Sequence, residues 1–238
     1  MLEIYNLSKS YGEKKAVEDL SFTVNAGELC AFIGHNGAGK TTTLKCVAGI
    51  LGFDAGHIRV DGVSLEDDPL EVKRRIAYIP DNPDLYDFMT GMQYLNFIAD
   101  VFDVPETVRA ERIAKYAEAL TLTEEEIGSP ISSYSHGMKQ KLALISAFLH
   151  DPKLILLDEP FVGLDPKASH VLKEIMRDFC EAGGAILFST HILEVAEKLC
   201  DKVAIIKGGH LVTFGKMEEV KGDSSLEDVF LELEGEND

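Results

Sequence analysis

The stretch that decides the fold runs from Cys30 to Gly49 and reads CAFIGHNGAGKTTTLKCVAG. It opens on an apolar run typical of a short strand, turns through a glycine-rich segment, and continues into a predicted helix. Glycines let successive backbone N–H groups turn toward phosphate oxygens, and the helix that follows adds its positive end. A chance glycine-rich turn is the alternative, but it would not require a strand before it and a helix after it. The stretch therefore predicts a phosphate-binding loop.

Two side chains of this loop have specific predicted roles. Lys40 should reach the β- and γ-phosphates of a nucleoside triphosphate, and the Thr41 hydroxyl should ligate Mg²⁺. ATP and Mg²⁺ are therefore the predicted cofactors. His35 stands at a variable position of the pattern. The residues predicted to surround the phosphates are Gly34, His35, Asn36, Gly37, Ala38, Gly39, Lys40, Thr41 and Thr42.

A second candidate element is LILLDEP, residues 154–160. Its apolar residues predict a buried strand with Asp158 and Glu159 at the carboxyl end, where open α/β sheets place their ligands. Asp158 suits Mg²⁺, directly or through water, and Glu159, pointing to the other side, could polarise an attacking water as general base. The alternative is a turn that carries two solvated carboxylates. A phosphate loop elsewhere in the chain favours the catalytic interpretation.

His191 directly follows the predicted strand AILFST, residues 185–190. An isolated histidine at such a place is more often structural. If this strand neighbours the other two, however, His191 lies beside the terminal phosphate, where it can donate a hydrogen bond and hold the water-polarising arrangement. We therefore predict a catalytic role for His191.

The order of elements along the chain predicts an α/β fold. Strand-like runs fill the first third, residues 90–150 read as helical, and strands and helices then alternate again, which is typical of a parallel sheet wrapped by helices. We predict one domain with a catalytic core over 1–89 and 151–215, an inserted helical block over 90–150, and a tail over 216–238. The tail should form a short amphipathic helix with an acidic end.

Composition excludes several classes of protein. The 238 residues are 45% hydrophobic, enough for a substantial core, and carry a formal net charge of −18, which disfavours nucleic acid as a partner. We recognise no signal peptide and no apolar run of about 18 residues, so we expect a soluble chain in the cytoplasm. The four cysteines lie singly in apolar surroundings and are predicted to be buried, reduced thiols.

One more stretch, SYSHGMKQK at residues 133–141, resembles a second anion-receiving helix start. Together with the phosphate loop, Asp158-Glu159, the Gly-Leu-Asp that ends at Asp165, and His191, it gives the chain a close resemblance to the nucleotide-binding subunit of an ABC transporter. The resemblance covers nearly the whole chain. It implies a P-loop NTPase core, a mostly parallel sheet wrapped by helices, with an N-terminal antiparallel β subdomain and an inserted α-helical subdomain.

The same resemblance implies how the chain works. Two nucleotide-binding subunits, identical or different, would sandwich two ATP molecules head to tail, and Ser135 and Gly137 of one would face the γ-phosphate held by the other. Tyr11 would stack on adenine, although plain packing is its alternative, and Asp165 would lie at the dimer seam. An integral-membrane permease would dock in a groove near 81–96, holding the subunit at the inner face of the cell membrane.

The chain departs from the usual family pattern at two places. Its signature reads Tyr-Ser-His-Gly-Met instead of Leu-Ser-Gly-Gly-Gln, and Asp81 occupies the position of a glutamine that touches Mg²⁺ or the attacking water. Asp81 could bind Mg²⁺ or serve only as polar loop surface, and both alternatives remain open. The signature form and the ending SLEDVFLEL resemble the branch of antibiotic, drug and sodium exporters, so export is the predicted direction.

Two other functions are weaker alternatives. A non-transport ATPase of the same superfamily, acting on DNA repair or ribosomes, usually brings coiled coils, a second cassette or basic surfaces. A nucleotide-regulated binding switch with negligible turnover would not need Glu159 and His191.

Overall fold

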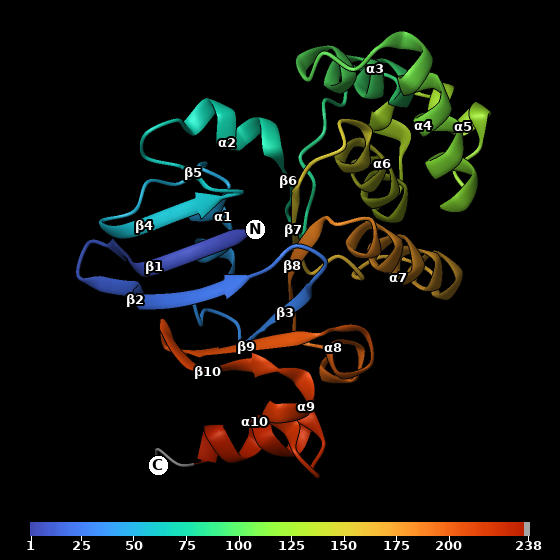
Figure 1. The fold of residues 1–238 in the computed structure, drawn as a ribbon. Coiled ribbons are helices and arrows are strands. Elements are labelled where there is room, and N and C mark those ends of the chain that lie inside the picture. Colours follow the sequence, from blue (N-terminus) through green and yellow to red (C-terminus); the bar gives the residue numbers. More distant parts are fainter. Residues whose placement is uncertain (236–238) are drawn as a thin grey trace.

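The computed structural model describes residues 1–235, with side chains to Leu233. Its centre is a six-stranded sheet in the order β10-β9-β3-β8-β7-β6, in which β10 alone runs antiparallel to its neighbour. Figure 1 shows helices on both sides of this sheet. The strands are β3 (Leu29–Ile33), β6 (Ile76–Ile79), β7 (Leu154–Asp158), β8 (Ala185–Thr190), β9 (Lys202–Lys207) and β10 (His210–Lys216).

A second, antiparallel sheet has the order β2-β1-β4-β5. Helix α1 (Lys40–Val47) packs between the sheets, because its buried Leu44 and Val47 share one core cluster with both. The central strand β3 alternates between two clusters: Cys30 and Phe32 face this one, whereas Ala31 faces the other. The second sheet consists of β1 (Leu2–Tyr11), β2 (Lys14–Val24), β4 (Ala55–Val60) and β5 (Val63–Ser64).

The helices between β6 and β7 form a separate block, in green to yellow at the upper right of Figure 1. They are α3 (Gly91–Val101), α4 (Glu106–Ala119), α5 (Glu124–Gly128), the 3-10 turn η1 (Ile131–Ser133) and α6 (His136–Leu149). Helix α6 is buried along most of its length after its first turn, and it packs against α3, α4 and β6, so it connects the block to the sheet.

The remaining helices lie outside the helical block. They are α2 (Pro69–Arg75), α7 (Pro166–Glu181), α8 (Leu193–Leu199), α9 (Met217–Lys221) and α10 (Leu226–Gly235). Asp165 is the N-cap of α7 and accepts the Ala168 N–H over 2.8 Å. Sequence analysis missed α2, which is only seven residues long and buries one side chain, Val72.

The arrangement confirms the predicted fold class: a mostly parallel sheet wrapped by helices, an N-terminal antiparallel sheet, and a helical insertion. The residue limits that we assigned to the subdomains remain predictions. The amphipathic helix predicted for the tail is α10, whereas part of its acidic end, residues 236–238, lies outside the described residues.

Candidate functional site

The phosphate loop connects β3 to α1 and forms one wall of a cavity of about 250 Å³. Two of its positions require glycine for space. A Cβ on Gly34 would overlap the Ile206 carbonyl oxygen. A Cβ on Gly39, where φ is +112°, would lie 2.5 Å from the Ala16 carbonyl oxygen. The backbone can therefore stay close to the neighbouring strands while the N-terminus of α1 faces the cavity.

Lys40 is the buried cation of this cavity, with 7% of its surface exposed. Its ammonium donates to the carbonyl oxygens of Gly34 over 2.5 Å and His35 over 3.2 Å. Burial lowers the pKa of Lys40, while the nearby carboxylates of Glu159 and Asp158 act in the opposite direction. The side chain is thus held within reach of a phosphate by its own loop.

Thr41 and Asp158 meet at the carboxyl end of the sheet. The Thr41 hydroxyl donates to Asp158 Oδ2 over 2.6 Å, and the Ser189 hydroxyl donates to Asp158 Oδ1. Mg²⁺ is usually held in nucleotide sites by one or two carboxylates together with phosphates and water. A hydroxyl and a buried carboxylate that already converge fit this requirement.

Sequence analysis gave Ser189 no role, yet its hydroxyl touches both carboxylate residues. Besides donating to Asp158, it accepts the N–H of Glu159 over 3.1 Å. The signal that could have found it is the register of the sheet, because Asp158 pairs with Ser189 across β7 and β8.

Glu159 and His191 share a hydrogen bond of 3.0 Å between Oε2 and Nδ1. Glu159 has a left-handed backbone conformation, with φ of +49°, which turns the chain sharply just after β7. Asp158 and Glu159 consequently face different partners, the first Thr41 and the second His191. A carboxylate oriented by a histidine beside a phosphate loop is suited to positioning and polarising a water molecule.

Tyr11 and Asp81 come from distant parts of the chain but line the same cavity as Lys40 and Thr41. Asn36, Gly37 and Thr42 line it as well, as do two residues that sequence analysis did not identify, Lys14 and Ala16. Tyr11 is 51% exposed, so its ring is available to a ligand. The structure therefore places most of the residues predicted to contact the nucleotide around one cavity.

The signature residues divide between two places. His136 lines a neighbouring cavity of about 530 Å³ together with Glu159 and His191. Neither Ser135 nor Gly137 lines this cavity or the 250 Å³ cavity of its own chain as far as the chain is described. Ser135 is exposed and caps α6 by accepting the Met138 N–H over 3.2 Å. Gly137 approaches Gly163 so closely that a Cβ would lie 2.7 Å from the Gly163 carbonyl oxygen. Asp165 likewise lies outside that lining, where it caps α7.

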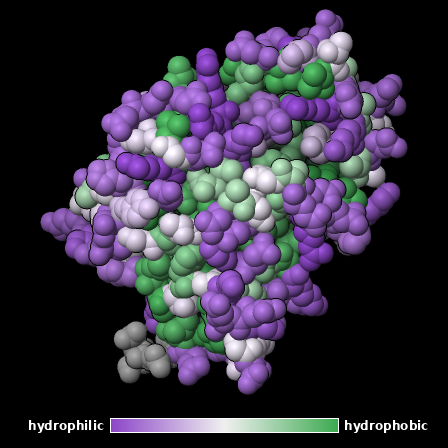
Figure 2. All heavy atoms as spheres, in the orientation of Figure 1, coloured by the Kyte–Doolittle hydropathy of each residue, from purple (hydrophilic) through white to green (hydrophobic). Residues whose placement is uncertain are grey.

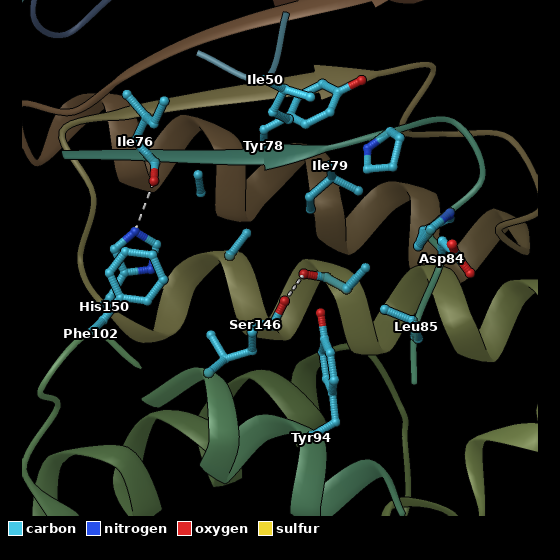
Figure 3. A pocket seen from close by; sticks show the side chains of 16 residues that line it. Ile50, Ile76, Tyr78, Ile79, Asp84, Leu85, Tyr94, Phe102, Ser146 and His150 are labelled. Atoms are coloured by element: carbon cyan, nitrogen blue, oxygen red, sulfur yellow. Dashed lines mark hydrogen bonds between the residues drawn. The ribbon is translucent and has the colours of Figure 1, made fainter. Parts of the chain in front are cut away.

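A further cavity of about 370 Å³ lies between β6 and the helical block (Figure 3). Its walls include Leu85 and Tyr94, and it overlaps the predicted docking range 81–96. At one end, His150 stacks on Phe102 with ring centroids 3.7 Å apart and shares a hydrogen bond of 3.1 Å with the Ile76 carbonyl oxygen. The groove is mainly apolar inside.

The surface beside this groove carries exposed aromatic rings. Phe88 is 82% exposed and Tyr86 45%, and their ring centroids lie 5.7 Å apart. Most of the face in Figure 2 is hydrophilic, with hydrophobic patches at the top, over the helical block, and in the lower half. Within the described residues, no helix is long and apolar enough to cross a bilayer.

The prediction for the cysteines is confirmed. All four are free and buried, and burial raises the pKa of the Cys46 thiol to about 11. Buried thiols in apolar surroundings are inert, so these cysteines belong to the core.

Comparisons with known proteins agree with this geometry. Residues 17–162 match the family model described as ABC transporter. The uncharacterized ABC transporter ATP-binding protein YxlF of Bacillus subtilis (strain 168) is 40% identical over 93% of this chain and 72% of its own length. The linearmycin resistance ATP-binding protein LnrL of the same strain is 32% identical over 90% of this chain and 69% of its own length.

A solved structure described as the ATP binding subunit of an ABC transporter has the same fold. It superposes with a TM-score of 0.94 at 37% identity, covering 98% of this chain and 99% of the other. The predicted family is thereby confirmed: the chain belongs to the ABC transporter family, among its ATP-binding proteins.

Proposed function

We propose that this chain is the Mg²⁺-dependent ATP-hydrolysing subunit of an ABC exporter and works as one of a pair. The observation that carries the proposal is the hydrogen bond of 3.0 Å between Glu159 and His191, beside a loop whose Lys40 and Thr41 are already positioned for phosphate and metal. A chain that only bound nucleotide would not require this pair.

The residues divide the work as follows. Backbone N–H groups of the loop and Lys40 bind the phosphates, and Thr41 and Asp158 hold Mg²⁺, which would neutralise charge on the phosphates. Glu159 takes a proton from the attacking water, and His191 keeps the Glu159 carboxylate directed at that water. Tyr11 stacks on the adenine. Asp81 lines the same cavity, so its carboxylate would contact the bound nucleotide or its Mg²⁺.

A second subunit would complete the site. Because Ser135 and Gly137 lie outside the cavity of their own chain, the N-terminus of α6 is available to an ATP bound by a partner. Each γ-phosphate would then be gripped from both sides, so ATP stabilises the dimer and hydrolysis releases it. Asp165 would lie at the seam of this pair.

A membrane-embedded permease would provide the transport path. The 370 Å³ groove of Figure 3, with exposed Phe88 and Tyr86 nearby, is a surface of suitable character for its docking. The subunit would therefore sit at the inner face of the cell membrane. Export as the direction is supported by the signature form, by the C-terminal ending and by the resistance function in the name of LnrL.

Phosphate release from Mg-ATP tests the enzymatic part of the proposal. The wild-type chain should release phosphate continuously, whereas Lys40→Ala should lose both nucleotide binding and release, because the loop then lacks its cation. Wild-type protein that binds ATP but shows no turnover, alone or with its permease, would favour a binding switch instead.

A further inference from the structure

The C-terminal helix α10 lies against the same end of the sheet as the phosphate loop. One face of α10 packs inward: Leu226 is fully buried, and Phe230 and Leu233 contact the core cluster below it. The opposite face is exposed, with Leu231 60% accessible. The spacing of the inward residues, four and then three apart, is that of one helical face.

Polar contacts fix both ends of this helix. Glu197 on α8 accepts the Leu226 N–H over 3.0 Å and the Lys221 ammonium over 2.8 Å. Near the other end, the Lys207 ammonium donates to the Leu233 carbonyl oxygen over 3.1 Å. Because α8 begins two residues after His191, α10 is attached to the segment that carries the candidate catalytic histidine.

Phe230 reaches from α10 to the phosphate loop. Its ring meets the His35 ring edge to face, with centroids 5.1 Å apart and planes at 62°. Both residues line a cavity of about 530 Å³ together with Glu159 and His191. The tail helix therefore contacts the phosphate loop and borders a cavity next to the one lined by Lys40 and Thr41.

The backbone of His35 is also a supporting point of the loop. Its carbonyl oxygen accepts from the Lys40 ammonium over 3.2 Å and from the Ala38 N–H over 3.1 Å. A ring held against Phe230 restrains the residue whose carbonyl helps to place Lys40. A loop restrained before ATP arrives loses less conformational freedom on binding it.

We propose that Phe230 is a positioning residue for ATP binding, which holds the phosphate loop through His35. This inference rests on the proposed function, because it concerns the same nucleotide site. The C-terminal helix then contributes to ATP affinity through Phe230, although that residue lies almost two hundred positions from the loop in sequence.

Affinity of the full chain for Mg-ATP, measured by calorimetry, tests the proposal. Phe230→Ala should weaken binding about 2- to 10-fold, the range of one aromatic pair, and raise KM more than it lowers kcat. Phe230→Leu should weaken Mg-ATP binding by a similar factor, because leucine keeps the apolar packing but lacks the ring. Leu231→Ala, on the exposed face of the same helix, is the matched control and should bind like wild type.

A double-mutant comparison with His35→Ala separates positioning from general loosening. His35→Ala removes the ring but keeps the backbone carbonyl, so Phe230→Ala should have no further effect in that background. Phe230 variants that bind like Leu231→Ala, or an undiminished effect of Phe230→Ala in the His35→Ala background, would overturn the inference and leave the proposed function standing. Wild-type protein that fails to bind Mg-ATP would overturn both.

Discussion

The Asp165 carboxylate lies 3.2 Å from the Lys141 ammonium, and this ion pair joins the loop after β7 to helix α6. The same connection is reinforced by the Gln140 amide, which donates to the Pro160 carbonyl oxygen over 3.4 Å, and by the close approach of Gly137 to Gly163. The loop that begins at Glu159 is therefore attached to the helix that begins at the signature. Movement of one has to displace the other or break these contacts.

The Asp165 contacts predict a pH-dependent contribution to stability. The Ala168 N–H and, next, Lys141 lower the pKa of Asp165 from its ordinary 3.8. Because the folded-state pKa is depressed, this stabilisation is present above 3.8 and is lost as pH falls through the lower folded-state value. Asp165→Asn keeps the helix cap but loses the charge, so it should unfold at a lower temperature than wild type at pH 7.

Thermal unfolding measured from about pH 7 down to about pH 3 checks this expectation. The difference in unfolding temperature between wild type and Asp165→Asn should narrow at the acid end, and this difference should be smaller at every pH in a Lys141→Met background. A gap that stays constant with pH would contradict the assignment.

Ser189 provides a test of the site residue that sequence analysis missed. Ser189→Ala removes a donor to Asp158 and an acceptor for the Glu159 N–H, in a place where Asp158 is only 2% exposed. We expect a loss of about 1–3 kcal/mol in the free energy of unfolding, together with a lower kcat for ATP.

Ser8→Ala is the control for Ser189→Ala, since the Ser8 hydroxyl also accepts a backbone N–H but lies in the antiparallel sheet. It should reduce stability without changing kcat. If both variants keep the wild-type kcat, Ser189 does not help to hold the two carboxylates.

We predict that Asp81 affects the coupling of ATP hydrolysis to the membrane partner more than it affects the hydrolysis rate itself. Asp81→Gln restores the length and neutrality of the residue usual at this position, so basal ATP hydrolysis should persist while its stimulation by the membrane partner changes. The measurement is phosphate release with and without that partner. Asp103→Asn, another loop aspartate, is the control; stimulation of Asp81→Gln indistinguishable from this control would refute the prediction.

Local sequence patterns were sufficient to predict which polar residues lie at the ends of the central strands. The loop at Gly34 to Thr42 and the carboxylates at Asp158 and Glu159 each follow an apolar strand, and parallel strands bring their carboxyl ends to one edge. The Ser135 cap was predictable for a similar reason, since a serine before a helix offers an acceptor to the third N–H.

Contacts that depend on strand order or on remote packing could not be predicted in this way. Ser189 meets Asp158 only because β8 is inserted between β3 and β7, and Phe230 meets His35 only because α10 folds back on the core. Lys14 and Ala16 reach the cavity through a sheet pairing that no local pattern specifies. Short α2 gave too few buried positions for a periodic signal.

The central claim is that ATP joins two copies of this subunit, or this subunit and a close relative, across Ser135. Sedimentation of Glu159→Gln with saturating Mg-ATP tests it most directly, because nucleotide should persist once the general base is lost. The account predicts an ATP-dependent dimer that disappears without ATP and in the additional variant Ser135→Arg, whose side chain would obstruct the facing phosphate. A purely monomeric Glu159→Gln protein at saturating Mg-ATP, with the second nucleotide-binding subunit also supplied where the transporter uses two different ones, would contradict it.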